Sequence, residues 1–414
     1  MITVNELGKR AKKASRQLLT LSDKIDLALS FIADDLRAYE DDIIKANKID
    51  IENGRNNGMS ESLIDRLMLN HDRIDSMAKG IEKIVTMDSP IGKTLWQNTT
   101  ENGLIIEKIT VPIGVIGIIF EARPNVTADA AGLCLKAQNA VILRGGKEAI
   151  NSNKAIAEIM RNAIEKAGLP KDCICLVEDT SRESANELMR LREYLDILIP
   201  RGGKGLISSV VENAKVPVIE TGVGNCHAFV DESADIDMAK NIVFNAKTSR
   251  VSVCNALETL LVHKNIAEKA LPRIAEKLKE KGVEIRGCEK TRKILGDEII
   301  LATDDDFKTE FLDYIISVKV VDSFDDAVDH IAKYSSGHSE TIITENKENA
   351  EKFLSLVDSA AVYVNASTRF TDGGEFGLGA EIGISTQKLH ARGPMGTSAL
   401  TSHKYIVHGN GQIR

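Results

Sequence analysis

The cysteines of this 414-residue chain lack the spacing of metal sites and of secreted disulfide frameworks. None of the six lies in a C-x-x-C pair, and no cysteine–histidine cluster has zinc-finger spacing. Cys226 beside His227 is the nearest approach to a metal site, and we expect no bound metal. Scattered cysteines in a long chain are typical of a reduced, intracellular protein.

Long apolar runs are also missing. The longest, residues 111–120, is interrupted by Pro112, Gly114 and Gly117 and is too short to cross a bilayer. The first residues, 1–6, lack the charged and then apolar pattern of a signal peptide. We therefore expect no membrane association and a cytoplasmic location.

The chain has no excess of basic residues. Its formal net charge is -8 and its charged fraction is 28%, which argues against a nucleic-acid partner, because such proteins present a broad basic face. Hydrophobic residues make up 43%, enough for a large core, and the length predicts two or three domains.

Residues 1–90 are polar with helical periodicity. A turn cluster at 98–103 then separates Leu95 from the alternating segment 104–109, which predicts a hairpin arm over about 93–111. Residues 404–407 are one further strand candidate near the end of the chain. An exposed two-stranded ribbon would leave bare edges.

From residue 115 onward, short apolar strands alternate with helices, a pattern that predicts parallel sheets covered by helices. Two successive series indicate two α/β domains with a ligand cleft between them. We set the domains at 1–225, 226–375 and a return segment with the tail strand at 376–414. The expected strands are 115–120, 140–143, 174–177, 197–199, 218–219, 228–230, 259–262, 283–286, 314–320, 341–344 and 361–364; the expected helices are 127–137, 153–167, 184–191, 205–213, 236–247 and 266–279.

Cys254 is set apart by its position in a polar connection between a helix and a strand. Such loops display catalytic residues, and Lys247 or Arg250 nearby could lower the pKa of the thiol. On local sequence alone, a half-buried structural thiol is the more common explanation.

Asn125 follows a strand and Pro124, where a new helix opens. It is either the helix N-cap or a side-chain amide that donates to an oxyanion. Two glycine-rich basic loops, 144–147 and 201–205, each follow a strand and lead into a helix. Backbone N–H groups, the helix dipole and cations could meet a phosphate there, although ordinary strand-to-helix turns have the same composition.

Taken in order, these segments resemble the aldehyde dehydrogenase superfamily over essentially the whole chain. The match is closest to its branch that reduces acyl phosphates. The segments that carry it are 111–125, 143–148, 200–204, 220–222, 253–259 and 377–396.

The resemblance implies an aldehyde-dehydrogenase-like α/β fold with two parallel or mixed-sheet domains and a small β oligomerisation arm. The hairpin and the strand at 404–407 resemble that arm, so we expect a homo-oligomer. It makes Cys254 the nucleophile and Asn125, with the backbone N–H of Cys254, the oxyanion donor. Glu220 lies 34 positions before Cys254, where hydrolytic relatives place a general base, and its role here stays open. The cofactor-binding residues that the resemblance implies are Arg144, Gly145, Lys147, Arg201, Gly202, Gly203, Glu220 and Glu310.

Relatives that use NAD carry a glutamate that binds the adenine ribose at the position of Lys147. A cation in its place favours a 2′-phosphate, so we expect NADPH. The substrate implied is L-glutamyl 5-phosphate, made by a separate glutamate 5-kinase and reduced to L-glutamate 5-semialdehyde on the route to proline. For its anionic groups we name Arg123, His338 and Arg369. Alternatives are a coenzyme A-acylating aldehyde dehydrogenase and a non-catalytic nucleotide-binding homologue.

Overall fold

A computed structural model describes residues 2–414, and the chain divides into two compact units. Unit 1 holds the residues up to Thr221, together with Gly377–Gly383 and Met395–Arg414. Unit 2 holds Gly222–Phe376 and Ile384–Pro394. The division falls four residues before the expected 225/226 boundary, and the segment after residue 376 is shared between the units. No helix within residues 2–414 combines the length and the apolar character needed to cross a membrane.

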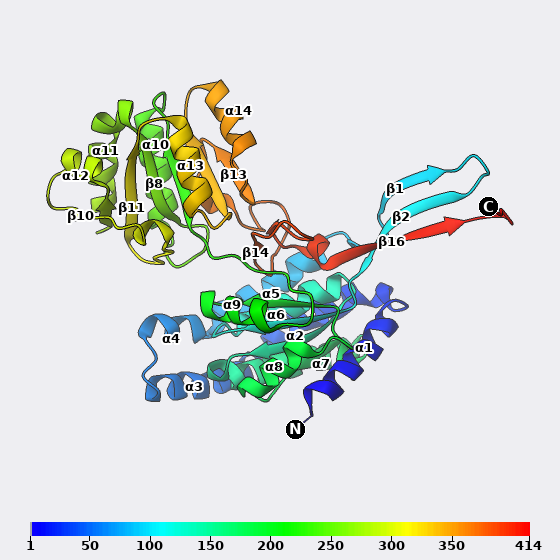
Figure 1. Cartoon of the computed structure of the whole chain (residues 1–414). Coiled ribbons are helices and arrows are strands. Elements are labelled where there is room, and N and C mark those ends of the chain that lie inside the picture. Colours follow the sequence, from blue (N-terminus) through cyan, green and yellow to red (C-terminus); the bar gives the residue numbers. More distant parts are fainter. Residues whose placement is uncertain (1) are drawn as a thin grey trace. The chain divides into compact units, whose positions relative to one another are not determined.

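A four-stranded parallel sheet in the order β5-β4-β3-β6 forms the centre of unit 1. Figure 1 labels the helices of this unit. Every residue of β3 is buried, as expected for a parallel strand that is covered on both faces. Helices α1 and α6 contact β3 and β4, while α7 contacts β5 and α9 contacts β6. The elements are β3 (Val115–Phe120), α6 (Asn125–Lys136), β4 (Ala140–Gly145), α7 (Ile150–Lys166), β5 (Ile174–Leu176), α8 (Arg182–Arg190), β6 (Ile197–Arg201) and α9 (Lys204–Asn213).

The polar N-terminal region is helical, as its periodicity predicts. Its apolar stripes are buried: α2 packs on α5 and α7, and α3 packs on α4 and α7. These helices are α1 (Val4–Leu18), α2 (Ile25–Ala38), α3 (Glu40–Asn56), α4 (Glu61–Leu67) and α5 (His71–Val85).

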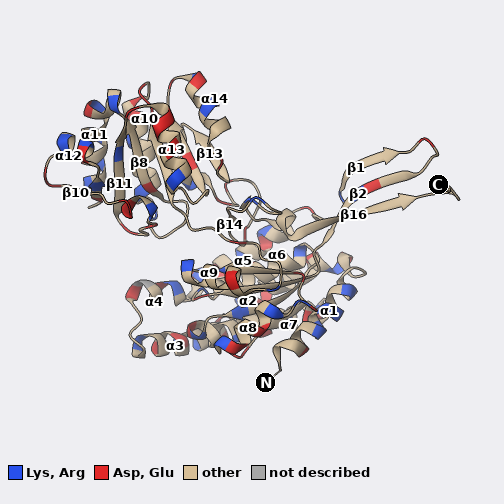
Figure 2. Ribbon diagram, viewed as in Figure 1, with Lys and Arg blue, Asp and Glu red and all other residues tan. Residues whose placement is uncertain are grey.

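The predicted hairpin is confirmed, and the C-terminal strand lies beside it. Strand β1 (Thr94–Thr99) pairs antiparallel with β2 (Ile105–Pro112), which pairs on its other edge with β16 (Thr401–His408). All of β1 is exposed, and the Trp96 and Tyr405 rings meet edge to face at 6.5 Å. Figure 2 shows these strands largely without charge, whereas the helices of both units carry charges of both signs.

A seven-stranded, wholly parallel sheet in the order β10-β9-β11-β8-β7-β12-β13 forms unit 2. Alternate residues of β7 enter separate cores: Ala228 and Val230 join one apolar cluster and Phe229 the other. The elements are β7 (Cys226–Val230), α10 (Ile236–Thr248), β8 (Leu257–His263), α11 (Lys264–Lys279), β9 (Glu284–Gly287), α12 (Glu289–Leu295), β10 (Ile300–Leu301), β11 (Ile315–Val321), α13 (Phe324–Tyr334), β12 (Ser339–Ile343), α14 (Lys347–Leu356), β13 (Ala361–Val364), β14 (Ile384–Ser385) and β15 (Gly393–Pro394).

The expected α/β fold class with a small β arm is confirmed. One expected strand is wrong: residues 218–219 make only a single bridge, between Val218 and Leu198. The short strands β10, β14 and β15 were not expected, because two residues carry no detectable periodicity.

Candidate active site

Cys254 lies on the loop between α10 and β8, and its side chain is half-buried. Four of the other cysteines are buried, and burial raises the pKa of the Cys173 and Cys175 thiols to about 12. Cys288 is also half-buried, but its sulfur contacts Thr291 Oγ1 at 3.3 Å and accepts from a backbone N–H. Among the described cysteines, position therefore still favours Cys254 as the reactive thiol.

The backbone carbonyl of Cys254 is held from the side of β7. Cys226 Sγ donates to Cys254 O at 3.2 Å. A β-carbon on Gly224 would lie only 1.6 Å from the same oxygen, so only glycine fits there. Glu310 Oε1 accepts from Gly224 N at 2.8 Å, which fixes the glycine in turn. Glu310, expected at the cofactor, thus supports the nucleophile loop in this structure.

The other side of the loop is held by the segment after β13. Asn255 Nδ2 donates to Thr371 O at 2.9 Å and to Arg369 O at 3.3 Å. Thr368 Oγ1 donates back to Asn255 O at 2.8 Å. The residue next to Cys254 is therefore fixed by three hydrogen bonds to one segment.

Two arginines belong to the surroundings of the Cys254 loop: Arg250 lies on it, and Arg369 contacts Ser249 at its start. Arg369, half-buried, donates from Nε to Ser249 Oγ at 3.0 Å. Burial, and then the charge of Arg250, lower the pKa of Arg369, while Cys254 is among the groups that raise it. Arg369 lies in unit 2 with Cys254, and its binding of substrate stays a prediction.

Lys247 does not influence the thiol in the way the sequence suggested. Its ammonium group is buried and donates to Glu258 Oε2 at 2.7 Å, and both side chains are 0% exposed. Burial raises the pKa of Glu258 to about 7, and the Lys247 charge opposes that shift. Lys247 thus forms a buried ion pair with Glu258. Of the two cations expected to lower the pKa of the Cys254 thiol, only Arg250 is exposed.

His338 is also placed differently from expectation. It is 0% exposed, and Nδ1 lies 2.8 Å from Ser339 Oγ and 3.6 Å from Cys226 Sγ. Because the ring is enclosed in unit 2, it does not offer an edge to a substrate. It lies instead behind Cys226, which supports the Cys254 carbonyl.

In unit 1, Asn125 is the first residue of α6 and not its N-cap, which is Pro124. The N-cap interpretation is therefore wrong. Asn125 Nδ2 donates to Asp129 Oδ2 at 2.9 Å, one helical turn further on. Burial raises the pKa of Asp129 to about 6, against the effects of Asn125 and of the Arg201 charge. Arg123 precedes this turn and is half-buried.

The first glycine loop follows β4. Arg144 Nη2 donates to the Thr180 and Ser181 carbonyls at 2.8 and 2.9 Å, and burial lowers its pKa. A β-carbon on Gly145 would lie 2.1 Å from Asn153 Nδ2, which explains the glycine. Lys147 begins a 3-10 turn (Lys147–Ala149) and is exposed. Arg144 thus positions the loop before α8, while Lys147 is the cation that faces solvent.

The second glycine loop follows β6 and leads into α9. Gly203 N donates to Glu121 Oε2 at 2.8 Å, and a β-carbon on Gly202 would lie 2.7 Å from that carboxylate. Arg201 is half-buried, and its guanidinium lies 3.5 Å from where a β-carbon on Gly383 would stand. Glu220 is half-buried in the same unit, next to Thr221, whose Oγ1 donates to Pro200 O at 2.8 Å.

The structure therefore collects the predicted cofactor residues on unit 1, with Glu310 as the exception, and the nucleophile with Arg369 on unit 2. Sequence reasoning missed Glu121, Asp129 and Gly224. Glu121 lies in the segment that was singled out and Asp129 follows it in the next helix, but neither carboxylate gave a signal without the neighbouring chain. Gly224 could not be distinguished from any loop glycine.

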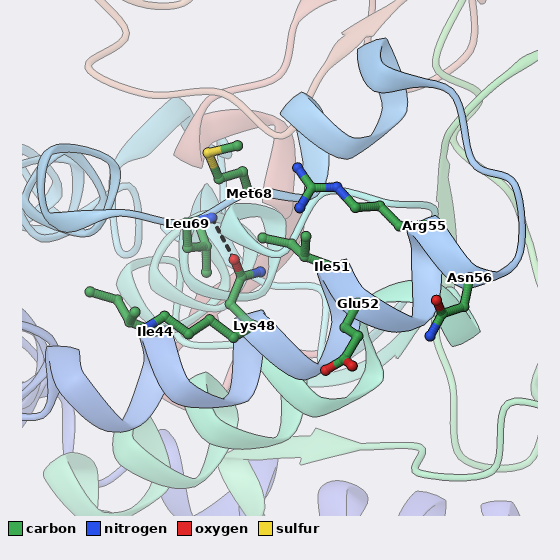
Figure 3. A pocket seen from close by; sticks show the side chains of 9 residues that line it. Ile44, Lys48, Ile51, Glu52, Arg55, Asn56, Met68 and Leu69 are labelled. Atoms are coloured by element: carbon green, nitrogen blue, oxygen red, sulfur yellow. Dashed lines mark hydrogen bonds between the residues drawn. The ribbon is translucent and has the colours of Figure 1, made fainter.

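A separate pocket of about 430 Å³ lies in unit 1, beside α3 and the connection from α4 to α5 (Figure 3). Asn47 Oδ1 accepts from Leu69 N at 2.7 Å and closes one side of it. None of the predicted site residues lines it, so it is distinct from both glycine loops. It is lined by Ile44, Asn47, Lys48, Ile51, Glu52, Arg55, Asn56, Met68 and Leu69.

Comparison with known proteins gives a consistent result. Residues 3–290 match the aldehyde dehydrogenase family. A gamma-glutamyl phosphate reductase from Halothermothrix orenii is 58% identical over 98% of this chain and 97% of its own length. The crystal structure of a gamma-glutamyl phosphate reductase from Thermotoga maritima has a TM-score of 0.97 at 52% identity, with 99% of both chains covered. An acetylating aldehyde dehydrogenase from Geobacillus thermoglucosidasius shares the fold, with a TM-score of 0.70 at 19% identity.

Proposed function

This chain belongs to the aldehyde dehydrogenase family, and from that premise we propose that it reduces L-glutamyl 5-phosphate to L-glutamate 5-semialdehyde and phosphate. The observation that carries the proposal is similarity over the full chain length to relatives that bear the name of this activity. The reaction is the second step from glutamate towards proline, and the acyl phosphate comes from a separate glutamate 5-kinase.

We assign the covalent step to Cys254. Its thiolate attacks the acyl carbon, the carbon–oxygen bond to phosphate breaks, and a thioester and free phosphate result. Arg250 and Arg369 accompany the thiol and stabilise its negative charge and that of the departing phosphate. A loop fixed on both sides, by Gly224 and by the Asn255 hydrogen bonds, suits a nucleophile that must keep one position.

We assign the hydrogen bonds to the oxyanion to the side-chain amide of Asn125 and the backbone N–H of Cys254. Asp129 Oδ2 accepts from Asn125 Nδ2 at 2.9 Å, which fixes the orientation of the amide and leaves the second N–H of that nitrogen to donate to the oxyanion. Glu220 is not assigned as a base, because transfer from phosphate requires no hydrolytic water. Arg123 remains a proposed contact for the substrate carboxylate.

The family uses nicotinamide cofactors, and we assign NADPH to the glycine loops of unit 1. These residues fit such a group: Lys147 is an exposed cation, and the backbone N–H groups at Gly203 open a ten-residue helix. When bound, NADPH supplies the hydride that reduces the thioester carbonyl. Release of the aldehyde then returns Cys254 to its thiolate form.

We further propose a cytoplasmic homo-oligomer whose contacts involve the arm of β1, β2 and β16. Trp96 is 48% exposed and Tyr405 59% exposed on strands with little charge, and both outer strands leave an unpaired edge. Light scattering on the full chain and on a Trp96→Glu, Tyr405→Glu variant tests this. A smaller assembly in the variant would support the arm as the contact, and an unchanged mass would contradict it.

The proposed activity is tested in reverse, by following NADP⁺ reduction with glutamate 5-semialdehyde. Rates that require phosphate would support the acyl-phosphate reaction. A requirement for coenzyme A in place of phosphate would overturn it, and activity with neither acceptor would indicate hydrolysis with Glu220 as the base.

A further inference from the structure

A carboxylate from a neighbouring loop already occupies the glycine loop before α9. Glu121 directly follows β3, and the parallel pairing places Phe120 beside Arg201, so the ends of β3 and β6 meet. From there Glu121 Oε2 accepts from Gly203 N at 2.8 Å, and its carboxyl carbon lies 2.7 Å from where a β-carbon on Gly202 would stand.

This contact uses the groups that a phosphate would use. Gly203 is the N-cap of α9 and has no side chain of its own to accept from the first N–H groups of the helix. The positive end of the helix dipole attracts one negative group at this position. A carboxylate and a phosphate cannot both accept from the Gly203 N–H in the same geometry, so one must displace the other.

We propose that the Glu121 carboxylate is a built-in competitor for the cofactor phosphates at the start of α9, and that it leaves Gly203 whenever the cofactor binds. This inference rests on the proposed assignment of NADPH to the loop. Glu121 is exposed and lies on a loop between β3 and α6, so it can turn to solvent without disturbing the core. By weakening binding of both cofactor forms, it would favour release of NADP⁺ after each turnover.

The test is NADPH binding to the full-length protein, measured by calorimetry without substrate. Glu121→Gln keeps the shape but removes the charge, so a weaker hydrogen bond must be broken, and we expect NADPH to bind about threefold to tenfold more tightly. Glu121→Asp keeps the charge but is one methylene shorter, so it should also bind more tightly. Glu212→Gln, in the last turn of the same helix, is the matched control for charge and should bind like the wild type.

Unchanged or weaker binding in both Glu121 variants would overturn the proposal, since weaker binding would make Glu121 a cofactor contact or a structural cap. Thermal unfolding of each variant identifies a protein that has not folded, and the other substitution then decides. If the wild type binds neither NADPH nor NADH, the proposed cofactor assignment fails. If it binds NADPH but the variants match it, only the role of Glu121 fails.

Discussion

The glycine loop before α9 in unit 1 and the cysteine loop of unit 2 are built in opposite ways. The cysteine loop is fixed from two sides, with Gly224 packed against the Cys254 carbonyl and Asn255 hydrogen-bonded to three groups of one segment. The glycine loop before α9 presents exposed groups, and its Gly203 N–H donates to Glu121, an exposed side chain. In the loop after β4, Lys147 is the exposed group.

This difference follows from what each loop must do. A nucleophile gains from one fixed position, because displacement by about 1 Å can cost roughly a hundredfold in rate. A loop that binds a cofactor and releases it in every cycle gains from groups that exchange partners at low cost. A rigid loop is thus expected where a covalent bond forms, and a loop with exchangeable contacts where a ligand binds and is released.

The comparison depends first on Cys254 as the reactive group of the rigid loop. Cys254→Ala should lower turnover by at least about a thousandfold, because no other group forms the thioester, and NADPH affinity should stay unchanged. Cys288→Ala, at the other half-buried cysteine, is the control and should retain activity. Phosphate-dependent NADP⁺ reduction measures both, and substantial activity in Cys254→Ala would refute the assignment.

The fixed position of the Cys254 loop can be disturbed by a substitution at Gly224. An added methyl group would collide with the Cys254 carbonyl, so Gly224→Ala should displace the loop and lower kcat by about a hundredfold. Cofactor binding on unit 1 should be unaffected. Calorimetric titration with NADPH alongside the rate assay separates the two effects, and a fully active variant would show that the loop tolerates movement.

Asn125, the oxyanion donor that we propose in unit 1, is expected to depend on one carboxylate. Asp129→Asn removes the charged acceptor that fixes Asn125, and kcat should fall by about tenfold, with little change in KM. The pKa of Asp129 is raised to about 6, so in the wild type kcat should also fall as pH drops through 6 and the carboxylate takes up a proton.

A merely structural Asp129 would give a different result. In Asp129→Asn the decline of kcat near pH 6 should disappear. If Asp129 acts through Asn125, the Asn125→Ala, Asp129→Asn double variant should be no slower than Asn125→Ala alone. A further loss in the double variant would mean that Asp129 acts elsewhere.

The sequence predicted the architecture well, because continuous apolar strands such as 115–120 alternate with amphipathic helices. It also identified the loops that carry Cys254, Asn125 and Lys147. What it could not predict is which neighbour each polar side chain contacts. Lys247 is close to Cys254 along the chain, yet its ammonium group turns into the core towards Glu258.

The same limit explains why the contacts of His338 and Glu310 could not be predicted. Their positions come from pairing of β7 with β12 and from the loop before β11, contacts about 100 residues apart that no local pattern encodes. Glycines show the limit most clearly: Gly224 is required by a carbonyl 30 positions later in the chain, and nothing around it in the sequence indicates that carbonyl.

The smallest expected effect concerns Lys147, the exposed cation of the glycine loop after β4. Lys147 is exposed in unit 1, so replacing it should alter cofactor choice and leave the fold intact. Lys147→Glu should shift the preference from NADPH towards NADH by about tenfold, because the new carboxylate repels a 2′-phosphate and accepts from ribose hydroxyls instead.

Lys215→Glu, at another exposed lysine of unit 1, makes the same charge change away from the loop and should keep the wild-type ratio. The ratio of kcat/KM for the two cofactors measures this. If Lys147→Glu left it unchanged, selectivity would have to reside in Arg144, which the structure already engages with the Thr180 and Ser181 carbonyls.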